Sequence, residues 1–206
     1  MVTTGNRDRV VAAARELLHK LGYRGSSMEQ IAATAGVSKS NVYYHFPTKE
    51  DVGIAVLESH RGDFESLVQS TLLCQDVPAT ERLQSMLSLL AGQRTAAQLG
   101  CPFGNLAAEM SEHSERLRCY LSGMFESMTE RLAAVVAEAQ ASGALRSDVT
   151  PRTAAALMVQ TAQGVQLISK CNRSCQSATL TLQALMRLLR VPESAMERTS
   201  SVQPVQ

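Results

Sequence analysis

The chain has 206 residues, 45% of them hydrophobic and 4% aromatic, with 20 Lys and Arg against 19 Asp and Glu. This length and apolar content exclude an intrinsically disordered chain and allow a buried core in one large domain or two small ones. No apolar run approaches the roughly 20 residues of a membrane span, and residues 1–9 carry no secretory signal, so we expect a helical, cytoplasmic protein without a membrane partner.

The first 47 residues predict three short helices. Apolar residues recur at spacings of three and four, which is typical of helices with one buried face. The signals that bound these helices are Gly22 as a stop, Ser27 with Gln30 as a capping box, Gly36 as a stop, Ser38 as an N-cap and Pro47 as a stop. A glycine-containing turn between the second and third helices predicts a helix-turn-helix motif.

Six further helices are predicted, and several of them are longer. They cover approximately residues 48–69, 78–98, a short segment from 102, 117–142, 151–170 and 178–189. Thr48 with Asp51, and Thr150 with Pro151, provide start signals of the same kind. The predicted fold class is therefore all-α, with nine helices.

The third predicted helix has an exposed face whose chemistry suits DNA. Val42 and Phe46, four residues apart, are expected to face the core. The remaining residues are of types that contact phosphates or base edges in a major groove: Lys39, Ser40, Asn41, Tyr43, Tyr44 and His45. The helix N-terminus at Ser38 is a further phosphate-docking position. The alternative is ordinary surface exposure and, for His45, packing against a neighbour.

Charge also favours an anionic partner for this end of the chain. Residues 1–50 hold seven Lys and Arg against four Asp and Glu, and the remainder holds thirteen against fifteen. The N-terminal segment is thus basic on a slightly acidic body, although a difference of this size also occurs by surface scatter.

Residues 27–50, SMEQIAATAGVSKSNVYYHFPTKE, strongly resemble the DNA-binding segment of the tetracycline-repressor (TetR) family. The residue-level match covers 7–58, and the rest matches in helix number and length. The resemblance implies a nine-helix TetR-like architecture with a DNA-binding domain at 1–47, a connecting helix at 48–70, a ligand-binding and dimerisation domain at 71–192 and a flexible tail at 193–206. It implies DNA contacts by Ser27, Lys39, Ser40, Asn41, Tyr43, Tyr44, His45 and Lys49, although Ser40 replaces a commoner Gly.

The last two predicted helices favour a homodimer. One recognition helix contacts only a few base pairs, so specific binding requires two copies on a near-palindromic operator in double-stranded DNA. The resemblance implies a four-helix interface, for which we expect Met158, Leu182, Leu185, Met186 and Leu189. The alternative is that these apolar residues serve only the core of the monomer.

The segment GCPFGNLAAE at residues 100–109 predicts a sensing or ligand-binding site. Pro102 suits the first helical position and places Cys101 at the N-cap, where a thiolate is favoured. We expect Cys101 to be the most reactive of the five cysteines, with Cys74 and Cys119 buried; the alternative is a structural cap. The segment is similar to one in a branch of the family with cysteine-based sensors. The residues expected at the site are Cys101, Phe103, Asn105, Glu109, Met124, Met128 and Met158.

These observations predict a DNA-binding transcriptional regulator, taken as a repressor that an unidentified small ligand or cysteine modification releases from its operator. The rival interpretations are an enzyme, with Cys101 as nucleophile and His113 or Glu109 as base, and an RNA-binding protein. No further catalytic set accompanies these residues, and no cysteine or histidine spacing predicts a metal or cofactor site. RNA-binding modules need aromatic platforms or strands, which this chain lacks.

Overall fold

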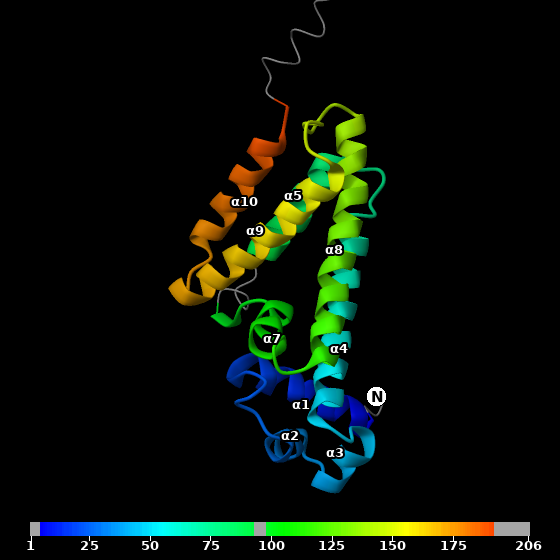
Figure 1. Ribbon diagram of the computed structural model, residues 1–206, viewed down its shortest axis with the longest axis vertical. Helices are drawn as coiled ribbons and strands as arrows, with labels where there is room; N and C mark the ends of the chain where they lie inside the picture. Colours follow the sequence, from blue (N-terminus) through cyan, green and yellow to red (C-terminus); the bar gives the residue numbers. More distant parts are fainter. Residues whose placement is uncertain (1–4, 93–97, 192–206) are drawn as a thin grey trace, which may run out of the picture.

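The computed structural model describes residues 5–92 and 98–191. Its helices are α1 (Asn6–Leu21), α2 (Met28–Ala35), α3 (Lys39–His45), α4 (Lys49–Thr71), α5 (Ala79–Gly92), α7 (Pro102–Met110), α8 (Glu115–Ala141), α9 (Pro151–Asn172) and α10 (Gln176–Leu189). The predicted all-α class with nine helices is confirmed over these residues (Figure 1). Extended pairing within them is limited to one isolated bridge between Leu145 and Arg190. The predicted tail at 193–206 and residues 93–97 of the fifth predicted helix lie outside the described residues.

The helix starts follow the capping signals in the sequence. Ser27 and Gln30 form a reciprocal capping box at α2, and Thr48 and Asp51 form another at α4. The Ser38 hydroxyl accepts a hydrogen bond from the Asn41 backbone N–H at 3.2 Å and caps α3. Each bond satisfies a donor that the first helical turn leaves without a partner. The predicted starts of these three helices are confirmed.

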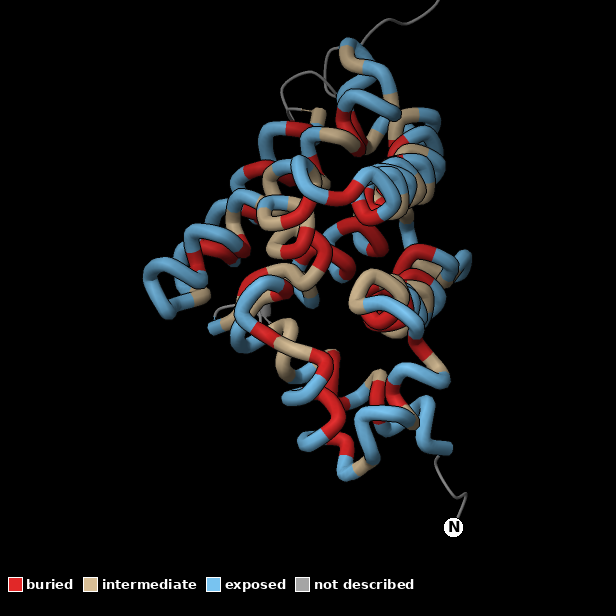
Figure 2. The backbone as a smooth tube through the Cα atoms, turned by 60° about the horizontal axis from the view of Figure 1, so that its bottom comes forward, coloured by how far each residue is buried: buried red, intermediate tan, exposed pale blue. Residues whose placement is uncertain are grey.

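Two apolar cores divide the helices. The first core joins α1, α2, α3 and the start of α4, and its buried members are Val10, Ala13, Ala14, Met28, Ile31, Ala32, Ala35, Val42, Phe46, Val52, Ala55 and Val56. The second core includes Tyr23 of the α1–α2 loop and Leu57 of α4, and it continues through α5, α7, α8, α9 and α10. Figure 2 shows these buried residues on the inner sides of the helices. Because α4 contributes to both cores, it joins the three-helix unit mechanically to the rest of the protein.

The larger unit is built around long helices. α8 packs against α9 and α5, and α10 packs against α9 and α5. In Figure 1, α4 and α8 run upward from the α1–α3 unit, and α9 and α10 lie toward the far end. Among the described helices, none combines the length and the apolarity of a membrane span.

Candidate DNA interface and ligand cavity

The α3 helix presents the polar face that the sequence predicts. Val42 is fully buried and Phe46 nearly so, whereas Tyr44 is 82% exposed and Tyr43 is 41% exposed. Lys39 is also exposed; it pairs with Glu29 and lies 5.8 Å from the centroid of the Tyr43 ring. Such exposure is unusual for tyrosine in a helix that anchors an apolar core, and it leaves these side chains accessible to a partner.

Other residues of the predicted interface are partly engaged within the protein. The hydroxyls of Ser27 and Ser38 serve as helix caps, and Ser38 Oγ also lies 3.0 Å from Ser40 Oγ. Asn41 is half-buried, and its Oδ1 has no hydrogen-bond partner among the described residues. His45 is half-buried, with its ring 5.0 Å from Tyr44 and 6.4 Å from Phe46 between centroids. These contacts support the alternative interpretation of His45, in which its ring packs against neighbouring side chains.

Lys49, expected to contact a phosphate, has partners within the protein. Its ammonium donates to the backbone carbonyls of Tyr23 and Ser26 and lies 4.4 Å from the centroid of the Tyr23 ring. Burial lowers the pKa of Lys49. The first turn of α4 is thus fastened to the loop between α1 and α2. Carbonyl acceptors and an aromatic face thus engage this cation within the protein, and its contact with a phosphate stays a prediction.

Glu109 and Asn105 lie at helix contacts and not at the main cavity. A Glu109 oxygen accepts from the Tyr23 backbone N–H at 2.8 Å, and the other accepts from the Arg24 N–H. The Asn105 amide donates to the Leu99 carbonyl at 2.6 Å. Both side chains thus have partners within the protein, and their contact with a ligand stays a prediction. Their hydrogen-bonding capacity is used to join α7 to the α1–α2 loop and to the chain before α7.

We expect Glu109→Gln to loosen the junction between α7 and the α1–α2 loop. The change removes a charge that strengthens two backbone hydrogen bonds, each worth about 1.5–3 kcal/mol when one partner is ionised. Hydrogen exchange should become faster at the amides of Tyr23 and Arg24, and the thermal midpoint should fall. Glu112→Gln, at an exposed position nearby, is the control. Unchanged protection at both amides would contradict this role.

A cavity of about 730 Å³ lies among α1, α4, α5, α7, α8 and α9. Its apolar wall includes Phe64, Leu67, Met86, Leu87, Leu90, Leu99, Phe103, Met128, Leu132, Met158, Val159 and Ala162. Three of the predicted ligand residues, Phe103, Met128 and Met158, belong to this wall, and Cys101 also lines the cavity. Met124 is buried in the second core and does not line it. The volume is typical of small-molecule sites.

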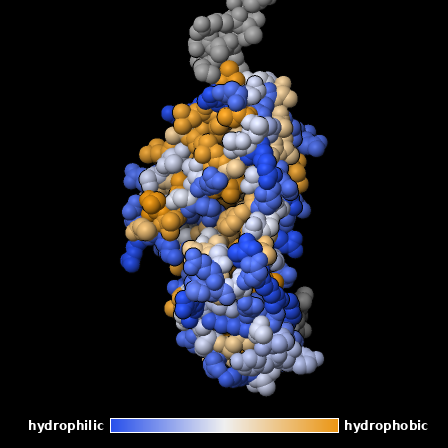
Figure 3. Space-filling model, viewed as in Figure 1, coloured by the Kyte–Doolittle hydropathy of each residue, from blue (hydrophilic) through white to orange (hydrophobic). Residues whose placement is uncertain are grey.

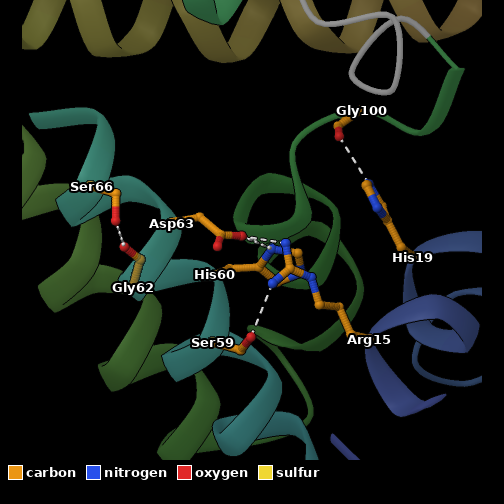
Figure 4. A network of polar contacts seen from close by, with 8 residues as sticks. All are labelled: Arg15, His19, Ser59, His60, Gly62, Asp63, Ser66 and Gly100. Carbon is orange, nitrogen blue, oxygen red and sulfur yellow. Dashed lines mark hydrogen bonds and ion pairs between the residues drawn. The ribbon is translucent and has the colours of Figure 1, made fainter. Parts of the chain in front are cut away.

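One side of the cavity carries a polar network that sequence analysis missed (Figure 4). Arg15 pairs with Asp63 and donates to Ser59 Oγ at 3.0 Å. His19 Nε2 donates to the Gly100 carbonyl at 3.1 Å, and the rings of His19 and His60 lie 6.1 Å apart. The network brings α1, α4 and the segment before α7 together. The spacing of His60 and Asp63 places them on one face of α4, but the sequence does not reveal that α1 meets that face.

Cys101 is the N-cap of α7 with Pro102 at the start of the helix, as predicted. Burial raises the pKa of the Cys101 thiol and outweighs the hydrogen bonds from Gly104, Gln163 and Phe103, which opposes the expected reactivity; that reactivity stays a prediction. Cys119, expected to be buried, is exposed on α8, and Cys74 is half-buried. Leu117 and Leu121 lie two positions to either side of Cys119, but Cys119 itself is on the exposed face of its helix.

The residues predicted for the dimer interface are buried within the monomer. Met158 lines the cavity, and Leu182, Leu185, Met186 and Leu189 belong to the second core. A different set of large apolar residues is exposed on the outer face of the same two helices: Leu157, Leu167, Ile168, Leu180 and Leu188. Figure 3 shows hydrophobic residues gathered over α9 and α10, while the α1–α3 end is mainly hydrophilic. The predicted helices thus carry an apolar surface, but on the opposite face.

The two-helix motif, its exposed polar face and the separate cavity define a helix-turn-helix DNA-binding protein. Residues 10–56 match the family model of bacterial regulatory proteins of the tetR family, and residues 79–185 match that of the tetracyclin repressor-like C-terminal domain. The chain therefore belongs to the TetR family of DNA-binding transcriptional regulators.

Individual relatives agree with this assignment. The HTH-type transcriptional repressor DhaR of Mycobacterium sp. (strain GP1) is 30% identical over 190 residues, which cover 90% of this chain and 95% of DhaR. The crystal structure of regulatory protein TetR from Rhodobacter sphaeroides superposes with a TM-score of 0.81 at 26% identity, covering 88% of this chain and 97% of that one. The reduced form of E. coli NemR has the same fold, with a TM-score of 0.81 at 22% identity over 91% of this chain and 98% of that one. The family and its relatives are transcriptional regulators and not enzymes.

Proposed function

We propose that this regulator is a homodimeric repressor that leaves a palindromic operator when a small ligand occupies the cavity. TetR regulators bind DNA and dimerise, and the relative DhaR is named a repressor. A role at chromosomal DNA supports the cytoplasmic location expected from the sequence.

The proposed DNA contacts are made by the exposed face of α3. Lys39, Ser40, Tyr43 and Tyr44 are exposed there, with Asn41 and His45 at its margin. A lysine and tyrosines are suited to phosphates, and serine and asparagine are suited to base edges. Ser27 and Ser38 would act through the helix N-termini that they cap, where backbone N–H groups attract phosphate.

The observation that carries the proposal is that α1 and α4 each contribute residues both to the first core, which holds α3, and to the cavity wall. Val10 and Ala14 of α1 are buried in the first core, while Arg15 and His19 line the cavity. On α4, Val52 to Val56 contribute to the first core, and His60 to Ser70 face the cavity. A ligand that shifts either helix changes the separation of two recognition helices, which must match about one DNA turn, ~34 Å. The protein is then released from DNA if the ligand binds more tightly to the shifted conformation than to the DNA-bound one.

Covalent release through Cys101 is the second route to the same outcome. Cys101 lines the cavity, so modification would place a new group inside it. The raised pKa leaves little thiolate at neutral pH, which favours the non-covalent route. If Cys101→Ser kept ligand-induced release, the non-covalent route would be supported; loss of all release in this variant would favour the covalent one.

A cavity-filling variant tests the proposal even while the effector is unidentified. Ala162 is buried in the cavity wall, and we expect Ala162→Phe to exclude ligands by occupying their space. Small molecules that raise the thermal midpoint of the wild type but not of Ala162→Phe are cavity ligands, and Ala134→Phe, at an exposed site on α8, is the control. These molecules should release wild-type protein from an operator selected from random DNA. Cavity ligands that leave operator affinity unchanged would overturn the proposal.

A further inference from the structure

We infer that the cavity selects an uncharged ligand, an apolar molecule with one hydrogen-bonding head group that is bound by His60 or Gln166. This inference rests on the proposed ligand-responsive function and names the chemical class of the ligand. It follows from the pairing of the charged groups around the cavity and from two buried polar side chains.

The charged groups of the cavity wall are paired with one another. Among the described lining residues, the acidic and basic side chains other than histidine are Arg15, Glu16 and Lys20 of α1 and Asp63 of α4. Arg15 pairs with Asp63, and Lys20 pairs with Glu16 at 2.7 Å. The described lining residues of α5, α8 and α9 carry no charge. Within this part of the chain, an ionised ligand would find no counter-ion that is not already paired.

Burial lowers the pKa of both histidines of the wall, which favours their neutral forms. Burial lowers the pKa of His19, and its Nε2 carries the proton that is donated to the Gly100 carbonyl. Burial and the neighbouring Arg15 lower the pKa of His60 to about 4, against a weaker opposing effect of Asp63. The groups that face His60 are Arg15 and His19 from α1, Asp63 from α4 and the ring of Phe103 from α7, 6.0 Å away. A neutral imidazole offers one donor and one acceptor, and not a charge.

Among the uncharged polar side chains of the wall, His60 and Gln166 are the ones that are buried. Each is only 8% exposed, and each lines the cavity, His60 from α4 and Gln166 from α9. Asp63 lies 4.0 Å from His60 Nδ1, which is beyond hydrogen-bond distance. Buried polar side chains in proteins are normally hydrogen-bonded. A hydroxyl, carbonyl or amide on a ligand would supply a partner.

The apolar remainder of the wall disfavours charge. An ionised group that leaves water for this wall loses its hydration free energy. The charged side chains of the wall are already paired with one another, so they compensate for little of that loss. An uncharged polar group loses far less and regains a hydrogen bond. The cavity should therefore discriminate against both carboxylates and amines of the same shape.

Four probes with one scaffold test this inference directly. 4-Butylbenzyl alcohol, 4-butylbenzoate, 4-butylbenzylammonium and 4-butyltoluene differ only in the head group, and their binding to the full chain without DNA is measured by calorimetry at pH 7.5. We expect the alcohol to bind at least about tenfold more tightly than either ion, and more tightly than the hydrocarbon. The alcohol should lose its advantage over 4-butyltoluene in His60→Phe or Gln166→Leu, but keep it in Gln160→Leu, an exposed position on α9.

The outcomes separate this inference from the proposed function. Equal or tighter binding of the benzoate or the ammonium, or no binding of any probe, would overturn the inference, and so would an alcohol preference that survives in both variants. Release of operator DNA is measured separately. If the alcohol binds as expected but leaves operator affinity unchanged, the ligand class stands and the release function fails.

Discussion

Replacing Lys39 and Tyr43 together with alanine is expected to weaken specific DNA binding by at least about 100-fold. Both side chains are exposed on α3, and neither belongs to the first core. A dimer would lose four contacts of about 1 kcal/mol each, and every 1.4 kcal/mol changes affinity tenfold. Because two lysines are lost from the dimer, the slope of log affinity against log salt should also become shallower by about 2.

The control for this variant removes another ion-paired cation. Arg146 pairs with Asp148 in the segment between α8 and α9, away from α3, so Arg146→Ala should retain operator affinity (Figure 1). Anisotropy titrations with a selected operator at several salt concentrations provide the measurement. If the double variant bound the operator like the wild type and kept its salt slope, the proposed DNA face of α3 would be wrong.

The DNA-binding unit could be predicted well because its signals are local. The capping partners Ser27 with Gln30 and Thr48 with Asp51 are three residues apart, and Val42 and Phe46 are separated by one helical turn. Patterns of this kind determine helix starts and inner faces independently of tertiary contacts.

The roles of Lys49 and Glu109 could not be predicted because their partners are distant in sequence. Lys49 donates to a carbonyl 26 residues away, and Glu109 accepts from an amide 86 residues away. Backbone groups of a loop carry no side-chain pattern that would reveal such a partner. The polar side of the cavity was missed for a similar reason, since Arg15 and Asp63 come from different helices.

The surface proposed for dimerisation could not be located from the sequence. α9 and α10 have apolar residues on two faces, so periodicity indicates burial without saying which face packs inside the monomer. Leu185 and Leu189 face inward, and Leu180 and Leu188 face outward. A charge at Leu185 would therefore disrupt the monomer core, and a test of dimerisation must use the outward residues.

Leu188→Glu is expected to yield monomers that have lost specific operator binding. Leu188 is 70% exposed on α10, a helix that packs against α9 and also exposes Leu180. An exposed patch of this kind normally marks an interface, and two-fold pairing would bury both copies of the residue. Burying an unpaired carboxylate costs several kcal/mol, so the dimer dissociation constant should rise by at least about 100-fold.

Sedimentation at micromolar concentration and circular dichroism distinguish a lost interface from a lost fold. Leu73→Glu, at a leucine that is 59% exposed just after α4, is the matched control and should remain dimeric. The Leu188→Glu monomer should keep its helical signal and weak, salt-sensitive DNA binding, because α3 is unchanged while one half-site supplies too few contacts for specificity. A folded Leu188→Glu dimer with wild-type operator affinity would place the interface elsewhere on the protein.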